Sequence, residues 1–592
     1  MIDTLSKIFL NLDKNHQKEA LMLAKKNGQY LPVSTAEFAR RVRNISSGLK
    51  VAGLNKGDKL VILSENGPEW VMVDVATVSG GGVTVPVYTN LAPDQIKYII
   101  NDSQARFLVC SNLKLWQKIT SIRHELPLVE KYILMEGNVP DGVVGLAEVE
   151  KIGEQYNLDH PADFDRAALS ILPDDLATII YTSGTTGTPK GAMLSHYNLV
   201  NNIQTLRSLV DFNSGDTALS FLPLSHVLER MCTFAWLYVG ATIAYAESVE
   251  TVADNLVEAR PTIMVSVPRF FDKFYAAVVD SVLGSPNLQR RIFFWALKVG
   301  RKYVQVKTSH GQLPAWLKVR YQLAYRLVFS KIVERTGGRV RFFVSGGAPL
   351  AREIAEFFYA MGILIIEGYG LTETSPVISL NTVSDFKFGT VGKVLPGEEV
   401  KFAPDGEILV HGPNVMKGYF NKETLTEEAF EDGWFKTGDV GYLDQDGFVV
   451  ITDRKKDIIV TSGGKNVAPQ PIENALMASP YIANVVVTGD RRKFVSALIV
   501  PDLEKTKKYA AEHNLTFSTE KELVEKPEIY NFFMQEINRL TSHLASYEKI
   551  KKIVILDRDF EIETGEMTPT LKVRRKVIEE KYKPLIDRLY VD

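Results

Sequence analysis

The stretch YTSGTTGTPKGAMLSHYNL, from Tyr181 to Leu199, follows the apolar run DDLATII and gathers glycine, serine and threonine around one lysine. An apolar strand that ends in such a turn and leads into a helix is the local unit of an open α/β sheet, and ligands bind at the carboxyl ends of these strands. The glycines let backbone amides approach an anion closely, the hydroxyls add donors, and Lys190 adds positive charge. The stretch therefore predicts an α/β fold with a phosphate-binding loop, although a Gly/Thr run without the strand and the lysine would predict a flexible surface loop.

The loop is not a Walker loop, because the order GxxxxGK[ST] is absent and Pro189 precedes the lysine. Its predicted phosphate contacts are Thr182, Ser183, Gly184, Thr185, Thr186, Gly187 and Lys190. Which phosphate it holds depends on the motifs elsewhere in the chain.

Apolar strands alternate with helical stretches over the first part of the chain. KLVILS and VTVPVY, at residues 59–64 and 83–88, flank the helical PEWVMVDVATVS, and the same alternation recurs at ALSFLPL, TIAYA, TIMVSVP, VRFFVSGG and ILIIEGYG. This pattern predicts mostly parallel sheets covered by helices. From Lys393 onward, short strands separated by turns predict a small β-rich subdomain over residues 393–452. We expect an N-terminal domain over 1–452, a hinge at Asp453 and a smaller α+β C-terminal domain over 454–592.

Composition excludes several classes of protein. The formal net charge of −2 over 592 residues does not favour nucleic acid as a partner, and two cysteines support neither a disulfide framework nor a thiolate zinc site. The N-terminus lacks the pattern of a signal peptide. The apolar run from Met231 to Ala246 is shorter than the ~18–20 residues of a membrane span, so it predicts a buried helix followed by a strand. A cytoplasmic protein is expected, and its oligomeric state stays open.

Several further motifs follow in a fixed order along the chain: FLPLSHVLER (221–230), SGGAPL (345–350), GYGLTETSP (368–376), GWFKTGDVGYLDQDGFVVITDRKKDIIVTSGGKN (433–466) and MTPTLKVRR (567–575). With the loop at 181–191, this series resembles the acyl-adenylate-forming superfamily over nearly the whole chain, and PLSHVLER is most similar to its long-chain fatty acyl-CoA synthetases. The resemblance implies ATP, Mg²⁺ and coenzyme A as cofactor and co-substrates.

The resemblance assigns the nucleotide contacts residue by residue. Thr372 is implied as a phosphate contact, and Glu373, with Thr185, as a Mg²⁺ ligand, since Mg²⁺ takes one or two carboxylates plus phosphate oxygens. Asp439 and Arg454 are implied as the contacts with the ribose. The adenine slot is implied at Gly346, Gly347, Ala348 and Pro349, with Tyr369 stacked on the ring, and Glu367, Gly368 and Gly370 are implied as further nucleotide contacts. Taken alone, TET would be a helix cap, and the charged residues would be turn or surface charges.

Lys572 matches the family lysine that a mobile C-terminal domain carries to the acyl carboxylate and the α-phosphate. A placed ammonium stabilises the charge that develops there in the transition state. Asp453 matches the hinge, and Lys465, in the GGKN loop, would serve the incoming coenzyme A after rotation. Catalysis then needs no side-chain nucleophile, and the implied catalytic set is Lys572, Thr372, Glu373 and His226.

The predicted identity of the substrate acid and of the acyl acceptor depends on individual residues rather than on whole motifs. Gly370 replaces the tryptophan of acetate-type enzymes, which predicts an open floor for a longer chain. His226 is implied at the acyl entrance, with a packed core histidine as the alternative, and Arg230 stands where other long-chain enzymes carry a gating tryptophan. Long-chain fatty acid:CoA ligase is the predicted activity. A fatty acyl-AMP ligase, an aryl or medium-chain acid:CoA ligase and a non-catalytic adenylate-binding regulator are the alternatives.

The segment from Arg290 to Arg341 carries thirteen Lys or Arg residues against one acid, Glu334, with eight aromatic residues interleaved. Basic amphipathic helices with aromatic residues lie on anionic membranes, which predicts peripheral contact with the inner membrane face. A solvated basic helix face above ordinary core aromatics would give the same pattern.

Overall fold

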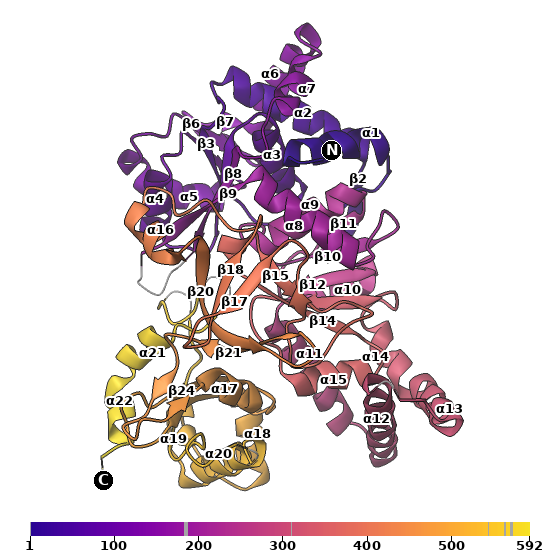
Figure 1. Cartoon of the computed structure of the whole chain (residues 1–592), viewed down its shortest axis with the longest axis vertical. Helices are drawn as coiled ribbons and strands as arrows, with labels where there is room; N and C mark the ends of the chain where they lie inside the picture. The colour runs from indigo at the N-terminus through magenta and orange to yellow at the C-terminus, as the bar shows by residue number, and fades with distance from the viewer. Residues whose placement is uncertain are drawn as a thin grey trace.

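The computed structural model of the chain describes residues 2–182, 188–309, 311–542, 544–561, 564–568 and 572–591. The seven-stranded sheet lies in the upper part of the molecule, the five-stranded sheet lies beside the nine-stranded sheet in the middle, and the C-terminal unit lies at the lower end (Figure 1). None of the described helices is both long enough and apolar enough to cross a bilayer.

Two large sheets, each mostly parallel, form the N-terminal part of the described chain. The first has the order β7 (Val144–Gly145), β6 (Lys131–Leu134), β5 (Phe107–Cys110), β3 (Lys59–Leu63), β4 (Val83–Val87), β8 (Leu176–Thr182) and β9 (Lys190–Ser195). The second has the order β16 (Lys393–Val394), β15 (Val377–Leu380), β14 (Ile365–Gly370), β13 (Phe342–Ser345), β12 (Ile263–Ser266), β10 (Thr217–Ser220), β11 (Thr242–Tyr245), β1 (Met22–Lys26) and β2 (Gln29–Val33). The predicted mixed α/β fold with parallel-rich sheets is confirmed.

Helices cover the faces of these sheets, which explains why the strands are continuous apolar runs. All five residues of β4 are buried, as expected of a strand covered on both faces. The main covering helices are α1 (Leu5–Asn15), α2 (Thr35–Val51), α3 (Pro68–Ser79), α4 (Pro93–Asp102), α5 (Leu113–Ile122), α6 (Leu146–Asp159), α7 (Asp163–Leu169), α8 (His196–Leu209), α9 (Val227–Val239), α10 (Val252–Ala259), α11 (Pro268–Leu283) and α15 (Arg352–Ala360). The run from Met231 to Ala246 is α9 followed by β11, as predicted, and Gly240 at φ +68° ends the helix in the left-handed conformation.

The β-rich subdomain is a five-stranded antiparallel sheet of the described chain. Its strands are β17 (Glu399–Phe402), β18 (Glu407–His411), β19 (Phe430–Glu431), β20 (Trp434–Leu443) and β21 (Val449–Arg454). Arg454 pairs with Asp439 and Asp453 with Val440, so the expected hinge residue lies inside a paired strand, and the sheet extends through Arg454.

The C-terminal unit has its own core and two small sheets, β22–β23 and β24–β25–β26. Its strands are β22 (Ile459–Val460), β23 (Asn466–Val467), β24 (Ile482–Thr488), β25 (Ser496–Pro501) and β26 (Ile553–Ile555), and its helices are α17 (Pro469–Met477), α18 (Leu503–Glu512), α19 (Glu520–Val524), α20 (Pro527–Leu540), α21 (Arg575–Lys581) and α22 (Lys583–Arg588). A separate apolar cluster that includes Ile499, Phe533 and Ile537 fills it.

Two polar contacts dock this unit on α11 of the N-terminal part. Lys505 Nζ lies 2.9 Å from Asp280 Oδ2, and Arg269 Nη2 lies 3.9 Å from Asp559 Oδ2. Partly exposed ion pairs of this kind contribute about 0–1 kcal/mol each, so they hold the unit loosely.

The phosphate-loop segment differs from the expected strand-to-helix turn. β8 and β9 form an antiparallel pair in which Thr182 opposes Lys190 and Tyr181 opposes Gly191, and helix α8 begins only at His196. The loop therefore connects two paired strands. KGAMLS is itself a strand, because its apolar side chains pack on the sheet before the helix starts.

Candidate active site

Lys190 and Glu373 come together through an aromatic ring. The ammonium of Lys190 lies 5.2 Å from the ring centroid of Tyr419, and the Tyr419 hydroxyl donates to Glu373 Oε1 at 2.9 Å. The predicted phosphate lysine and the predicted metal carboxylate thus lie at one end of the site. Residues Ser183, Gly184, Thr185, Thr186 and Gly187, on which the remaining loop predictions fall, lie outside the described residues.

Thr372 and Glu373 follow the carboxyl end of β14 in a short 3₁₀ turn, η3 (Thr372–Thr374). Thr372 is buried, and Glu373 is half-buried. No group of three or more His, Cys, Asp or Glu residues forms a metal site within the described residues. A single half-buried carboxylate fits Mg²⁺ that arrives with a triphosphate, because that ion keeps phosphate and water oxygens as its other ligands.

Asp439 is held from two sides at the opposite end of the site. Tyr369 donates its hydroxyl to Asp439 Oδ2 at 2.8 Å, and Arg454 Nε lies 2.9 Å from Asp439 Oδ1. The Tyr369 side chain packs in an apolar cluster beneath the pair. Asp439 is therefore a carboxylate held in a fixed position by two partners, which suits the hydroxyls of a ribose.

The Gly346–Pro349 loop follows β13 and is braced from below by Glu367. Leu350 N donates to Glu367 Oε2 at 3.3 Å, and burial raises the pKa of Glu367 to about 8. Gly347 has φ +79°, where a side chain would be strained. Ala348 and Pro349 are exposed at the strand ends. The loop is thus exposed at the carboxyl edge of the sheet, and its role as an adenine slot stays a prediction.

Gly370 has a different structural role from the expected one. A Cβ built at Gly370 would lie 1.6 Å from the carbonyl oxygen of Pro376, so close backbone packing against β15 excludes any side chain there. The expected open tunnel floor therefore does not account for this glycine. At Gly368, a Cβ would lie 2.9 Å from Leu380, again inside the sheet.

Lys572 projects from the C-terminal unit towards this site. Desolvation by the surrounding protein is the largest effect that lowers the pKa of Lys572 to about 8, and the charge of Arg454 lowers it further. The charge of Asp439 raises this pKa in part. The lysine retains solvent-exposed surface, so it is accessible to a ligand. The predicted lysine, aspartate and arginine are thus brought together from two sequence-distant units.

His226 caps the N-terminus of α9, where its Nδ1 accepts from Leu228 N at 3.2 Å. Burial, together with the charge of Lys572, lowers the pKa of His226 to about 3. The imidazole is therefore neutral, and its proton resides on Nε2. The histidine is half-buried and lies close enough to Lys572 for that charge to act on it, and its place at an acyl entrance stays a prediction.

Arg230 is part of the core rather than of a gate. Its guanidinium forms a bidentate pair with Asp74 of α3, with both N–O distances at 2.7 Å, and both side chains are 1% exposed. Removing one partner from such a pair costs about 3–5 kcal/mol. The pair fixes α9, and with it His226, against α3.

Lys465 lies in the C-terminal unit, and Asp453, the expected hinge residue, lies in β21 next to Arg454. Lys465 is exposed in the β22–β23 turn, and its ammonium lies 5.9 Å from the ring of Tyr547. Asp453 accepts from Gln470 N, at the start of α17, at 3.1 Å. Among the described contacts, Lys465 meets none of the residues around Asp439, so the structure brings Lys572 and not Lys465 to the site.

Sequence reasoning missed Tyr419 and the link from Tyr369 to Asp439. Tyr419 lies 46 residues from Glu373 and Tyr369 lies 70 residues from Asp439, so no local pattern connects them. The only local signal is the aromatic residue that follows Gly418 in KGYF, just before the β-rich turns.

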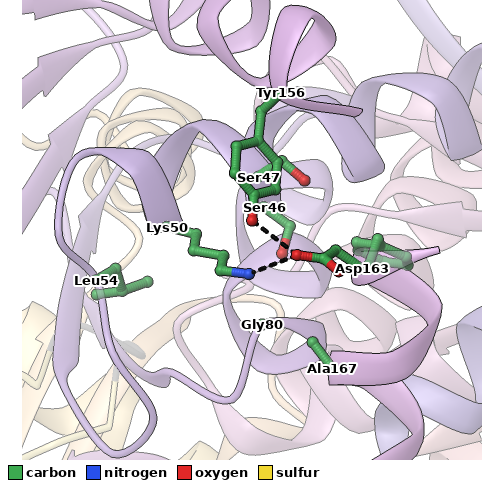
Figure 2. Close-up of a pocket in the computed structure, with 9 residues that line it drawn as sticks. Ser46, Ser47, Lys50, Leu54, Gly80, Tyr156, Asp163 and Ala167 are labelled. Carbon is green, nitrogen blue, oxygen red and sulfur yellow. Dashed lines mark hydrogen bonds and ion pairs between the residues drawn. The ribbon is translucent and has the colours of Figure 1, made fainter. Parts of the chain in front are cut away.

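A small cavity between α2, α6 and α7 lies away from these residues (Figure 2). Its volume is ≈ 30 Å³, which suits a single water molecule, and Lys50 Nζ lies 3.2 Å from Asp163 Oδ2 within it. It is a packing gap and cannot hold a nucleotide.

Fold and site together define an α/β nucleotide-binding enzyme whose C-terminal unit supplies a lysine to a site on the N-terminal unit. The chain matches the AMP-binding enzyme family over residues 10–420 and the AMP-binding enzyme C-terminal domain over residues 456–592. It belongs to the AMP-binding enzyme family.

Relatives extend over most of the chain. The long-chain-fatty-acid–CoA ligase FadD15 of Mycobacterium bovis is 36% identical over 95% of this chain and 93% of its own length. The peroxisomal long chain acyl-CoA synthetase 6 of Arabidopsis thaliana is 32% identical over 95% of this chain and 82% of its own. The ATP-bound structure of MatB from Rhodopseudomonas palustris matches with a TM-score of 0.69 and 26% identity, over 99% of this chain and 100% of MatB.

Proposed function

We propose that this protein is a long-chain fatty acid:CoA ligase that forms acyl-AMP from ATP and then transfers the acyl group to coenzyme A. The observation that carries the proposal is the convergence of Lys572 with Asp439 and Arg454, from two separate units, on the carboxyl edge of the large sheet. The names of the relatives, which cover nearly the whole chain, support the substrate class.

In the first half-reaction, an oxygen of the acyl carboxylate attacks the α-phosphorus of ATP and pyrophosphate leaves with the electron pair of the broken P–O bond. Asp439 holds the ribose and Lys190 holds the departing phosphates. Lys572 neutralises the charge that builds on the α-phosphoryl oxygens, while neutral His226 can donate from Nε2 to the acyl carboxylate. Glu373, with Thr185, would hold Mg²⁺, which would neutralise the triphosphate, and Thr372 would contact the phosphates.

In the second half-reaction, the thiol sulfur of coenzyme A attacks the acyl carbonyl carbon and AMP leaves. Lys572 has no role in this step, and we assign Lys465 to the phosphates of coenzyme A after the C-terminal unit rotates about Asp453. Loose docking of this unit on α11 supports the rotation, because the two ion pairs there cost little to break.

The experiment is acid-dependent ATP–pyrophosphate exchange with straight-chain acids of increasing length and with aryl acids. Exchange that peaks with long acids, followed by thioester formation on adding coenzyme A, is the expected result. Exchange without thioester would indicate a fatty acyl-AMP ligase, and a peak with aryl or medium-chain acids would change the substrate class. An ATP-binding protein without exchange for any acid would be a regulator.

We also propose that the helices within residues 290–341 contact an anionic membrane. On α13 (Ala315–Ala324) and the turn after it, Trp316, Val319, Leu323 and Leu327 are 49–66% exposed at helical spacing, so they form one apolar stripe. Arg320 and Lys302, of α12 (Asn287–Thr308), lie within 6.0 Å of the Trp316 ring. In Figure 1 both helices project from the body of the molecule.

The remaining aromatics of this segment support the alternative reading. Phe293 and Phe329 are buried, and Tyr303 stacks on Tyr321 with centroids 4.0 Å apart. Membrane contact therefore rests on the α13 stripe and the basic residues beside it. Basic residues near an anionic surface contribute about 1 kcal/mol each, and a substrate dissolved in lipid gives the contact a purpose.

Co-sedimentation with phosphatidylglycerol and phosphatidylcholine vesicles tests this contact. Binding to the anionic vesicles alone, lost in the double variant Trp316→Ser/Leu323→Ser and unchanged in Leu158→Ser, is the expected result. Leu158, on α6, is 71% exposed and serves as the matched apolar control. Equal binding of all three proteins would refute the assignment.

A further inference from the structure

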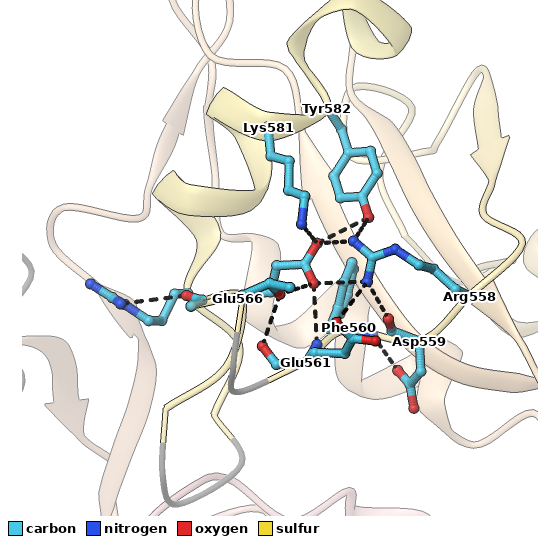
Figure 3. Close-up of polar contacts among 10 residues, drawn as sticks. Arg558, Asp559, Phe560, Glu561, Glu566, Lys581 and Tyr582 are labelled. Atoms are coloured by element: carbon cyan, nitrogen blue, oxygen red, sulfur yellow. Dashed lines mark hydrogen bonds and ion pairs between the residues drawn. The ribbon is translucent and has the colours of Figure 1, made fainter. Parts of the chain in front are cut away.

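A fully buried carboxylate, Glu566, lies just before the turn that carries Lys572. Arg558 makes a bidentate pair with it, through Nη2 to Oε1 at 2.7 Å and Nη1 to Oε2 at 3.0 Å. Tyr582 Oη donates to Oε1 at 3.0 Å, Lys581 Nζ lies 3.1 Å from Oε1, and Thr564 Oγ1 donates to Oε2 at 2.6 Å. Figure 3 shows Arg558, Lys581 and Tyr582 converging on the Glu566 carboxylate.

The charge state of Glu566 follows from these contacts. Burial alone would raise its pKa, but Arg558, Thr564 and Lys581 together hold the pKa of Glu566 well below its usual range. The group is therefore an anion at any working pH. A buried anion with every oxygen engaged fixes the geometry of the groups around it, because leaving any donor unpaired is costly.

The network joins chain segments that come before and after Lys572 in the sequence. Arg558 follows β26, and Lys581 and Tyr582 end α21. The backbone of Glu566 pairs with the residues that follow Lys572, because Arg574 N donates to Glu566 O at 2.8 Å. Met567 and Val573 form the adjacent antiparallel bridge. Lys572 O then accepts from Thr568 N at 2.7 Å.

The same turn also meets the N-terminal part of the protein. Arg269 of α11 lies 3.9 Å from the sulfur of Met567, the residue after Glu566, and forms its ion pair with Asp559, the residue after Arg558. The network thus lies directly behind the surface through which the C-terminal unit approaches the site.

We propose that Glu566 is a positioning residue for Lys572 in the adenylation half-reaction, acting through the Arg558–Lys581–Tyr582 network. It touches no substrate, and it sets where the ammonium of Lys572 lies when the turn docks. The inference rests on the proposed role of Lys572. Misplacing a catalytic group by about 1 Å costs on the order of 10²-fold in rate, which sets the expected size of the effect.

The test compares both half-reactions in Glu566→Gln, a variant of the same shape without the charge. We expect ATP–pyrophosphate exchange to fall on the order of 10²-fold, while thioester formation from supplied acyl-AMP and coenzyme A changes less than about threefold. Glu561→Gln is the control, because Glu561 is half-exposed and lies 3.8 Å from the same arginine. It should leave both rates unchanged.

A double variant separates positioning from a general loss of structure. If Glu566 acts through Lys572, adding Glu566→Gln to Lys572→Ala should cause no further loss of exchange. A multiplicative further loss, or equal loss of both half-reactions in Glu566→Gln, would overturn the proposal. Tyr582→Phe removes one donor without the charge, and it should give a smaller loss confined to exchange even if Glu566→Gln fails to fold.

Failure of this inference differs from failure of the proposed function. Unchanged exchange in Glu566→Gln, with exchange abolished in Lys572→Ala, would refute only the positioning role. Unchanged exchange in Lys572→Ala would refute the assignment of Lys572, and the inference with it.

Discussion

The C-terminal unit carries two lysine-bearing turns that differ in what surrounds them. Lys572 stands on a turn anchored by a buried network and lies close enough to Arg454 for that charge to lower its pKa. Lys465 stands on a two-stranded turn that faces solvent, with Tyr547 as its neighbour. One unit thus carries two exposed lysines, of which Lys572 and not Lys465 lies near Arg454 in this conformation, and this is the arrangement that the proposed adenylation step requires.

The largest expected effect is on the adenylation step, and it distinguishes Lys572 from Lys465. Lys572→Ala should lower ATP–pyrophosphate exchange on the order of 10²–10³-fold, the usual cost of removing a group that stabilises transition-state charge. Thioester formation from supplied acyl-AMP should be largely spared. Separate assays of the two half-reactions measure the two rates. An equal loss of both rates would contradict a role of Lys572 in the first half-reaction alone.

Lys465→Ala should give the converse result. Thioester formation should fall roughly tenfold, as expected for one charge-assisted contact with a phosphate, while exchange stays at the wild-type level. Single-turnover transfer from supplied acyl-AMP measures the effect. Lys493→Ala, in the neighbouring turn of the same unit, is the control, and a loss of exchange in Lys465→Ala would show that this lysine serves the first step.

The pH dependence of the two steps should also differ. Because the pKa of Lys572 is lowered to about 8, its ammonium is lost as the pH rises through that value. Exchange should fall about tenfold between pH 7 and pH 9. Lys572→Arg removes this limb, since a guanidinium stays protonated. An exchange profile that is flat to pH 9.5 in the wild type would contradict the assignment.

The smallest expected effect concerns the hinge. Burial raises the pKa of Asp453 to about 6, so the folded protein binds this proton more tightly than the unfolded chain. The resulting stability is fully present below about pH 4 and is lost as the pH rises through 6. Asp453→Asn should remove this dependence, with thermal midpoints that diverge from the wild type by roughly 1–2 °C across that window. If the thermal midpoints of the wild type and of Asp453→Asn change in parallel with pH, the Asp453 carboxyl is equally protonated in the folded and the unfolded protein.

The sequence predicted the fold because its local signals agree with the final structure. Apolar runs such as KLVILS and VTVPVY became buried parallel strands, and the motifs predicted Glu373, Asp439 and Arg454, whose charges lie close enough together to interact. The loop was predicted as a strand-to-helix turn because KGAMLS directly precedes the helical SHYNL and has no strand pattern of its own. Its pairing with β8 shows that KGAMLS is a strand.

What escaped prediction depends on tertiary contacts. Tyr419 reaches Glu373 only because residue 419 bridges Ala192 across the β8–β9 pair. The reason for glycine at 370 lies in the backbone of residue 376, which folds back against it. Neither contact leaves a periodicity or a spacing in the sequence, so both require the folded chain.

The packing at Gly370 constrains how this protein can change its substrate. The resemblance implies tryptophan at this position in acetate-type enzymes, yet here even a methyl group would meet the Pro376 carbonyl at 1.6 Å. A side chain at 370 therefore requires that the backbone around 376 move beforehand. Gly346 is less confined, because a Cβ there would meet the flexible tip of Leu228 at 3.3 Å and the Gly368 carbonyl oxygen at 3.9 Å. The order of substitutions, and not only their identity, therefore decides whether position 370 can accept a side chain.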